Sequence, residues 1–430
     1  MSTTEQPSKL GRGLSRLAAP LLIAVAIQSI ANLAFHAVVG RTLQAAEYGA
    51  LGAVLAGMTL VAVPLSALQT AAARTSAKHG VTRATAGRAL SRTLMVTLPL
   101  AALLVVAAGP IRDFLHLGSW LDAAVLAPTL VAAALVAIGR GLLLGIGRTG
   151  LVAGSFLVAT AVRLGPGLLC AYLWGISGAL IGTLIGEVAG LLVVVIPLLR
   201  AETGPLAVVT LGDLLRTAVV VAGLFAFSTV DLFLARHYLV GTESGFYVAA
   251  ATIGKTVLAL PAAALSVAYP KLVAGWLTDK KWAVLRSSLL VVGLPAVAGV
   301  AVVAIAPSLV LGILYGDSYS GAAGVTRILA IIAGLSAFVS VLAHAALARG
   351  SRWALIPWAA AGLEIVLIGL RHSTMTEVAQ GSGIALIVAL LALLATELPK
   401  WLGHRSAAAS PASAAGGIAG SAMAVPHPAG

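Results

Sequence analysis

The sequence predicts an all-α membrane protein that crosses the bilayer twelve times, as two parallel repeats of six helices. Three observations predict this class. Hydrophobic residues make up 60% of the chain and charged residues only 10%, whereas a soluble domain has about 25% charged residues. Apolar runs of about 20 residues, long enough to span the hydrocarbon as helices, recur along the chain. The two halves also resemble each other at an offset of 199 residues.

The apolar runs give the expected order of the helices. The first six spans are expected at 17–39, 49–72, 92–111, 121–145, 150–173 and 176–199. The second six are expected at 217–239, 246–270, 287–311, 321–346, 353–371 and 381–401. Residues 17–199 and 217–401 therefore form two six-helix bundles, joined by a cytoplasmic linker at 200–216. A cytoplasmic tail at 1–16 precedes the first bundle. The Ala-, Ser-, Pro- and Gly-rich stretch 402–430 is expected to be a disordered cytoplasmic tail.

The distribution of basic residues predicts the orientation. With the N-terminus in the cytoplasm, nineteen of the 27 Lys and Arg residues fall in cytoplasmic segments and four in outer segments. Cytoplasmic loops of membrane proteins carry this excess, so we expect both termini on the cytoplasmic side of the inner membrane. The formal charge of +13 is scattered between apolar runs, which favours topology signals over nucleic-acid binding. Cys170 is the single cysteine, and this excludes an intrachain disulfide.

The repeat is clearest in the stretch DLFLARHYLVGTESGFYVAAATIGK, which begins at Asp231. Its twin, NLAFHAVVGRTLQAAEYGALGAVL, begins at Asn32 and aligns Tyr48 with Tyr247. Six helices per half is an even number, so both copies start on the same side of the membrane and the repeats are parallel. Pro64 in the second span has a near counterpart in Pro261 of the eighth. Matched proline-interrupted helices point to bending elements near the central site of a transporter, so both prolines are candidate hinges.

Several stretches resemble a known family. RTLQAAEYGALG, VPLSALQTAAAR, GRGLLLGIGR, DLFLARHYL and GFYVAAATIGK are similar to the polysaccharide transporter family. This is the Wzx-type flippase branch of the multidrug/oligosaccharidyl-lipid/polysaccharide exporter superfamily. The resemblance implies two six-helix bundles in a V around a central cavity that opens to alternate sides. It also implies a polyprenyl-pyrophosphate-linked sugar as cargo. Implied partners are membrane lipids and, from the same pathway, glycosyltransferases and a polymerase. Unlike some relatives, the first span has no acid, and Gln28, Asn32 and His36 stand there instead.

A pyrophosphate cargo would need fixed cations in the cavity, and arginine suits bidentate contacts with phosphate. The basic residues expected within spans are Lys255, Arg163, Arg140 and Arg327, and together with Asn32 these form the candidate substrate-binding set. Each basic residue has a structural alternative. Lys255 would form a salt bridge to Asp231, and Arg163 would pair with Glu187. Arg327 would extend to the outer surface, and Arg140 to the cytoplasmic surface.

The acids within spans are candidates for coupling transport to an ion. A carboxyl group in a partly desolvated cavity is a plausible proton site, and Asp231 with Ser228 presents two oxygen ligands that would also suit Na⁺. Glu187 and Glu364 are the other candidates. Coupling to H⁺ or Na⁺ is thus expected, with no organic cofactor and no bound metal of another kind. Simple ion pairing is the alternative for each acid.

Two other functions stay open at this stage. A membrane-embedded polysaccharide polymerase or ligase usually displays a substantial outer loop with catalytic residues, whereas the outer connections here are short. A cation-coupled multidrug antiporter of the same superfamily should have a net acidic cavity, whereas the spans hold four basic and three acidic residues. GRGLLLGIGR lacks the GK[ST] of a phosphate-binding loop, so nucleotide binding is not expected. The leading expectation is a transporter and not an enzyme.

Overall fold

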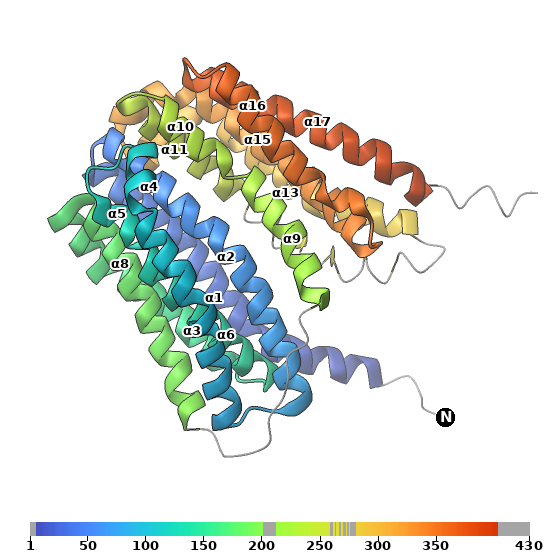
Figure 1. The fold of residues 1–430 in the computed structure, drawn as a ribbon. Helices are drawn as coiled ribbons and strands as arrows, with labels where there is room; N and C mark the ends of the chain where they lie inside the picture. The colour runs from blue at the N-terminus through green and yellow to red at the C-terminus, as the bar shows by residue number, and fades with distance from the viewer. Residues whose placement is uncertain are drawn as a thin grey trace, which may run out of the picture.

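The computed structural model describes residues 6–200, 212–258 and 281–402, and single residues between 261 and 275. The described residues form helices and connecting turns, with no strand among them. Figure 1 shows these helices as two bundles. The first contains α1 (Gln6–Thr42), α2 (Ala45–His79), α3 (Arg83–Val106), α4 (Ala108–Phe114), α5 (Trp120–Ala124), α6 (Leu126–Gly145), α7 (Thr149–Leu164) and α8 (Pro166–Leu199). The second contains α9 (Gly212–Phe227), α10 (Val230–Tyr238), α11 (Thr242–Val257), α13 (Lys281–Ile305), α14 (Pro307–Tyr315), η1 (Asp317–Ala322), α15 (Ala323–Ala348), η2 (Arg352–Leu355), α16 (Ile356–Leu370) and α17 (Met375–Leu402).

The predicted spans correspond to these helices, several of which are broken. Ten helices in the described part of the chain are long and apolar enough to cross a membrane. The fifth span is divided between the shorter α7 and the first turns of α8. The eighth begins as α11 and continues beyond the continuously described residues. These helices account for the predicted multi-pass, all-α membrane fold.

A tight turn inside α8 separates the fifth span from the sixth. Gly175 has φ +61° and ψ −134° there, a conformation that side chains other than that of glycine rarely adopt. The chain then reverses, and a Cβ atom on Gly182 would overlap the backbone of Gly167. Small residues at such a crossing let two helices pack closely. The turn at Gly175 and the close crossing of Gly167 and Gly182 thus both depend on glycine, and together they form the helical hairpin within α8.

The two bundles are packed mainly within themselves. In the first, α2 packs on α6, α7 packs on α8 and α1 packs on α7; in the second, α15 packs on α11, α13 and α17. Between the bundles, α2 packs against α9, α10 and α11, and α1 packs against α14. Figure 1 shows the bundles meeting near α4, α10 and α11 and diverging away from them. We name the end with the turns at 43–44, 115–119, 239–241 and 371–374 the joined end, and the opposite end, with the turns at 80–82, 146–148 and 349–351, the terminal end.

Glycines bring the two bundles into contact at the joined end. A Cβ atom on Gly52 of α2 would overlap Val248 of α11, and one on Gly245 of α11 would overlap the carbonyl oxygen of Ala45. Gly49 likewise faces the backbone of residues 244 and 245. The α2–α11 crossing thus depends on these glycines lacking side chains.

Arg236 of α10 also holds the bundles together. Its Nε donates to the carbonyl of Leu115 at 2.8 Å, and its terminal nitrogens donate to the carbonyls of His116 at 2.7 Å and Ala46 at 3.1 Å. All three carbonyls belong to the first bundle. One side chain therefore satisfies three backbone acceptors across the interface.

Exposed tryptophans mark both membrane boundaries. Trp120 and Trp174 are exposed at the joined end, and Trp282 and Trp353 at the terminal end. Tryptophan is enriched at the level of the lipid headgroups on both sides of a membrane. The helices between these positions therefore lie in the hydrocarbon.

Two helices begin before the spans expected from the sequence. The helix α1 begins at Gln6, so residues 6–16 of the expected N-terminal tail are helical. The helix α9 begins at Gly212, inside the expected linker 200–216. Residues 201–211 of that linker and 403–430 of the expected disordered tail lie outside the described residues.

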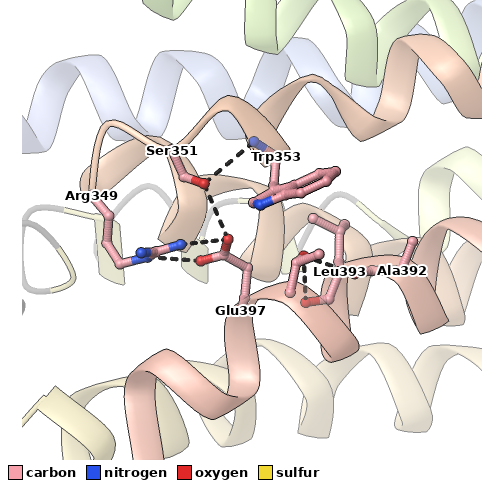
Figure 2. Close-up of polar contacts among 7 residues, drawn as sticks. Arg349, Ser351, Trp353, Ala392, Leu393 and Glu397 are labelled. Carbon is pink, nitrogen blue, oxygen red and sulfur yellow. Dashed lines mark hydrogen bonds and ion pairs between the residues drawn. The ribbon is translucent and has the colours of Figure 1, made fainter. Parts of the chain in front are cut away.

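A buried ion pair ties two helices of the second bundle at the terminal end. Arg349, which follows α15, donates to both carboxylate oxygens of Glu397 on α17, at 2.8 and 2.6 Å. Ser351 contributes a longer contact to the same carboxylate and accepts from the backbone N–H of Trp353, as Figure 2 shows. Glu397 is 0% exposed. Its charge is therefore compensated by protein groups.

Removing the Glu397 charge is expected to destabilise the protein strongly. A Glu397→Gln variant removes the charged partner of the Arg349 guanidinium, and breaking a buried ion pair costs about 3–5 kcal/mol. The matched control is Asp113→Asn, which breaks the exposed Arg112–Asp113 pair and should cost less than about 1 kcal/mol. Denaturant-induced unfolding of the purified protein in micelles measures both. Equal effects of the two variants would contradict the structural role of Glu397.

Labelling of single cysteines tests the orientation. In a Cys170→Ala background, Arg148→Cys lies at the terminal end and Ser373→Cys at the joined end. The charge distribution predicts that an impermeant maleimide labels Ser373→Cys in intact cells and Arg148→Cys only in inverted membranes. Labelling of both from the same side would refute the twelve-span arrangement.

Candidate functional site

A cluster of two acids and one lysine lies inside the second bundle. Asp231 is in the first turn of α10, directly after a break at Thr229 where the backbone is not helical. Its Oδ2 accepts a hydrogen bond from the Tyr247 hydroxyl of α11 at 3.1 Å, while its Oδ1 has no partner among the described residues. Glu364 of α16 is 1% exposed, and its Oε2 is buried without a partner too. Ser382 of α17 lies beside Glu364 and Tyr247. Two buried carboxylate oxygens thus stay available for a cation.

Lys255 lies near these acids without being paired tightly to either. It stands two turns after Tyr247 on α11 and interacts electrostatically with both Asp231 and Glu364. In the described part of the chain it forms no ion pair within 4.0 Å, and its side chain is partly exposed. The predicted Lys255–Asp231 salt bridge is therefore present only as a longer-range interaction, shared with a second acid.

A second cluster, in the first bundle, has the opposite balance of charge. Arg163 lies in the last turn of α7, and its Nη1 donates to Oδ1 of Asn32 on α1 at 3.0 Å. Its guanidinium lies 4.0 Å from the centre of the Phe35 ring, while its Nε has no partner among the described residues. Glu187 of α8 interacts electrostatically with Arg163 and with Arg140. Two guanidinium groups here interact with one carboxylate at longer range than an ion pair.

The two clusters occupy corresponding positions of the repeat. Asn32 aligns with Asp231 in sequence, and they lie on the first span of each bundle, in α1 and α10. Arg163 and Glu364 lie on the fifth span of each bundle, in α7 and α16. The same pair of helices thus presents an amide and a guanidinium in one half and two carboxylates in the other. The halves share a framework but favour ions of opposite sign.

The clusters approach each other at His36 of α1. His36 interacts electrostatically with both Arg163 and Lys255, which belong to different bundles. Its Nδ1 is 2.9 Å from the Tyr48 hydroxyl, which lies 3.1 Å from the hydroxyl of Tyr315 on α14. These contacts join α1 and α2 to the second bundle. Arg163, Lys255 and Asn32 therefore surround one region at the boundary between the bundles.

The position of this region follows from helix geometry. Asn32 is ten residues before the end of α1 and Lys255 thirteen residues after the start of α11, which places them about 15–20 Å from the joined end. Asn32 is exposed, and Arg163, His36 and Lys255 are partly exposed. Polar side chains at membrane depth are tolerated where they face protein or a water-filled space. We infer that these four face such a space between the bundles.

Three other predicted site residues do not contact Asp231 or Arg163 directly. Arg140 is buried in the first bundle, where its Nε donates to Ser155 Oγ at 3.0 Å and its guanidinium lies 3.7 Å from the centre of the Phe156 ring. Arg327 is exposed and donates to the carbonyl of Ala304 at 3.0 Å. Ser228 is exposed, and its hydroxyl donates to the carbonyl of Phe225. These three make no described contact with Asp231 or Arg163.

The two candidate hinges differ in how completely they are described. Pro64 is exposed within the continuous α2. Pro261 is helical and buried, but several of its neighbours lie outside the described residues. The hinge role of both prolines stays a prediction.

Sequence reasoning missed three contributors to these clusters. Tyr247 is repeated in the two halves of the sequence, but the repeat does not indicate what it does. Its hydrogen bond to Asp231 depends on the packing of α10 against α11. Ser382 gives no sequence signal. His36 was noted only as a polar residue in the first span, and the hydrogen bond to Tyr48, twelve residues away across the α1–α2 turn, explains its place.

Comparisons with known proteins identify the fold. No protein-family model matches the sequence, and no curated protein is significantly similar to it. Among solved structures, the lipid II flippase MurJ in an inward closed conformation is similar with a TM-score of 0.70 and 14% identity, over 88% of each chain. A multidrug resistance MATE family transporter of the MOP superfamily, in its inward-facing conformation, gives a TM-score of 0.68 and 16% identity over 89% of this chain and 99% of its own. An outward-facing structure of such a transporter gives 0.59 at 18% identity, over 87% and 93%.

The chain thus has the fold of these flippase and transporter structures. At these identities the likeness concerns the fold, and it does not select the Wzx-type branch.

Proposed function

We propose that this protein is a flippase of the inner, cytoplasmic membrane. Its cargo would be a polyprenyl-pyrophosphate-linked oligosaccharide, which it moves from the cytoplasmic to the outer leaflet by alternating access. The observation that carries the proposal is that Arg163, which donates to Asn32, and Lys255 of the opposite bundle both interact electrostatically with His36. A site built from both bundles changes shape whenever the bundles move against each other.

The chemistry of this site favours an anionic group. A charge at membrane depth is costly unless it is compensated, and neither Arg163 nor Lys255 has a carboxylate within 4.0 Å in the described chain. A guanidinium binds phosphate oxygens through two parallel hydrogen bonds, and an ammonium adds a point charge. A pyrophosphate between the two bundles would compensate both cations.

The described conformation fits the step of the alternating-access cycle in which the cargo binds. The bundles meet at the joined end, and the inner face predicted from the basic residues is the terminal end. The site would then be reached from the cytoplasm, where lipid-linked sugars are assembled by glycosyltransferases. The higher TM-score with an inward-facing than with an outward-facing MATE transporter supports this assignment.

The acid cluster would supply the driving force. Asp231 and Glu364 hold two buried oxygens that have no hydrogen-bond partner in the described part of the chain. These oxygens are a suitable place for H⁺ or Na⁺ to bind from the side to which the protein is open. We propose these two acids as the coupling site. Ser228 and Glu187, the other candidates from sequence, are respectively exposed and placed among arginines.

One observation favours a second function. The same two acids with a single lysine have a net negative formal charge, as a binding site for a cationic drug would require. A cation-coupled multidrug antiporter is therefore the alternative. This alternative predicts that organic cations compete with H⁺ or Na⁺ for binding at Asp231 and Glu364. It also predicts that transport does not require Arg163.

Translocation in proteoliposomes tests the proposal. A fluorescent polyprenyl-pyrophosphate-linked sugar is quenched from outside with dithionite, and movement between leaflets is followed with and without an imposed H⁺ or Na⁺ gradient. We expect gradient-dependent movement by the wild type, and a loss of about tenfold or more with Lys255→Met. Arg327→Gln, at an exposed residue outside the site, is the matched control. Failure of the folded wild type to move any pyrophosphate-linked lipid would refute the flippase function.

A further inference from the structure

Two arginines bind helix ends across the boundary between the bundles. Arg41, at the end of α1, donates from Nε to the carbonyl of Leu314 at 3.0 Å. Its Nη2 donates to the carbonyl of Ile313 and, at 3.3 Å, to that of Gly312. These carbonyls lie in the last turn of α14, in the other bundle. Arg236 of α10 makes the reverse connection, to the carbonyls that follow α4. Each bundle thus provides an arginine for a helix end of its neighbour.

The two contacts correspond in the sequence repeat. The helices α4 and α14 begin at Ala108 and Pro307, which are 199 residues apart, the offset between the two halves. The carbonyls that accept from the two Nε atoms, those of Leu115 and Leu314, are 199 residues apart as well. The arginines lie near the end of the first span of each bundle, although not at aligned positions. Equivalent carbonyls are therefore bound in both directions across the boundary.

We propose that Arg41 and Arg236 are paired latches of an outer gate. They hold the joined end closed while the protein is open at the terminal end, and both release when the protein opens outward. Arg41 is one residue before the end of α1 and Arg236 two residues before the end of α10, so both lie beside the turns of the joined end. The inference rests on the alternating access of the proposed function, but on no particular cargo.

The chemistry of helix ends explains why arginine suits this role. The last carbonyls of a helix have no partner within it, and they carry the negative end of the helix dipole. A guanidinium has five N–H donors and can satisfy several of these carbonyls at once. At membrane depth, carbonyls without a partner are costly unless water reaches them. The closed gate therefore depends on the two arginines, and the open gate depends on water that enters from the outer side.

The latches can also release without leaving a buried charge. In the described part of the chain neither arginine forms an ion pair within 4.0 Å, so parting of the bundles separates no arginine from a carboxylate. An arginine near the end of a span can extend its guanidinium to the headgroup level. The Arg349–Glu397 pair differs, because it is a buried ion pair within one bundle. Hydrogen bonds to neutral carbonyls thus suit a contact that forms and breaks in each cycle.

A third arginine provides the matched control. Arg327 of α15 donates from Nε to the carbonyl of Ala304 at 3.0 Å, in the last turn of α13. The chemistry is the same, a guanidinium at the C-terminal end of a helix, but both helices belong to the second bundle. Removal of Arg327 should therefore leave the contact between the bundles unchanged.

Sided labelling of one cysteine measures how often the gate opens. The reporter is Gly57→Cys in a Cys170→Ala background. Gly57 faces the ring of Phe233 across the α2–α10 crossing, and it stands twelve residues after the start of α2, about 18 Å from the joined end. An impermeant methanethiosulfonate is added, without cargo, to right-side-out or inverted membrane vesicles. Labelling from outside requires an open gate, so its rate follows the population of outward-open protein.

Arg41→Met combined with Arg236→Met should raise the rate of labelling from outside at least about tenfold, since loss of one charge-assisted hydrogen bond changes an equilibrium by about that factor or more. Labelling from inside should not become faster. Arg236→Lys, which keeps the charge but not the planar fork of donors, should give a smaller increase than Arg236→Met. Arg327→Met should change either rate by less than about twofold.

Each result supports or overturns the latches. An unchanged rate from outside in the folded double variant would overturn them, and so would an equal increase with Arg327→Met. Faster labelling from both sides would indicate general loosening of the bundles and would also overturn the proposal. Size-exclusion elution and thermal unfolding establish folding, and the two single variants decide the matter if the double variant does not fold. Because no cargo is present, failure of the flippase function would appear only in the translocation assay.

Discussion

Arg163→Met is expected to lower the affinity for farnesyl pyrophosphate at least about 30-fold. The Arg163 guanidinium is held by Asn32 and by the face of the Phe35 ring. Removing one member of a buried, hydrogen-bonded charge pair costs about 2–5 kcal/mol, and each 1.4 kcal/mol is tenfold in affinity. Calorimetry on the purified protein measures the change directly.

Two further substitutions separate charge from geometry. Arg163→Lys keeps the positive charge but loses the planar fork, and it should recover only part of the affinity. Arg327→Met removes an exposed guanidinium that donates to the carbonyl of Ala304, so it should change the affinity by less than about twofold. Near-normal binding by a folded Arg163→Met protein would exclude this residue from the site.

Gly245→Ala is expected to open the joined end. The added methyl group would overlap the carbonyl oxygen of Ala45, and backbone atoms on both sides leave no flexible group to move aside. The helices α2 and α11 must then separate, which weakens the contact that closes the space between the bundles. Spin labels at Gly118→Cys and Ser373→Cys, one in each bundle, should report a longer distance by pulsed electron paramagnetic resonance.

The control for Gly245→Ala is the same substitution where there is room. Gly87 of α3 has no atom within 4 Å of the position that a Cβ would occupy, so Gly87→Ala should leave the distance unchanged. Transport should fall with Gly245→Ala and not with Gly87→Ala. Identical distance distributions for Gly245→Ala and the wild type would contradict the role of this crossing in closure.

The overall architecture was predictable because its signals are local or repeated. Apolar runs fix the spans, and the alignment of Asn32 with Asp231 indicates the duplication without any knowledge of packing. The breaks within spans were less visible. The reversal at Gly175 was expected from the gap between two apolar runs, whereas the interruption at Thr229, which sets Asp231 at the start of α10, has no clear signal in the sequence.

The composition of the clusters depends on packing that the sequence does not reveal. Charged residues within spans were recognisable by their cost, and both predicted pairs, Lys255 with Asp231 and Arg163 with Glu187, are close enough to interact. The third member of each cluster can be identified only from the fold. Glu364 joins the first pair and Arg140 the second, because α16 and α6 pack beside the helices concerned.

The Arg349–Glu397 pair shows a different limit. Both residues lie near helix ends, where the sequence indicates surface charges. Their burial follows from the packing of α15 against α17. A charge near a span end is ambiguous until its neighbours are known.

The sign of the charge that the protein binds between its bundles tests the account most directly. Competition between farnesyl pyrophosphate and the lipophilic cation tetraphenylphosphonium, measured on the purified wild type, determines it. We expect farnesyl pyrophosphate to bind, and we expect that tetraphenylphosphonium does not displace it from Arg163 and Lys255. Arg163→Met combined with Lys255→Met should abolish the binding of farnesyl pyrophosphate. Binding of the cation alone, lost on replacement of Asp231 and Glu364, would contradict the account and establish the multidrug alternative.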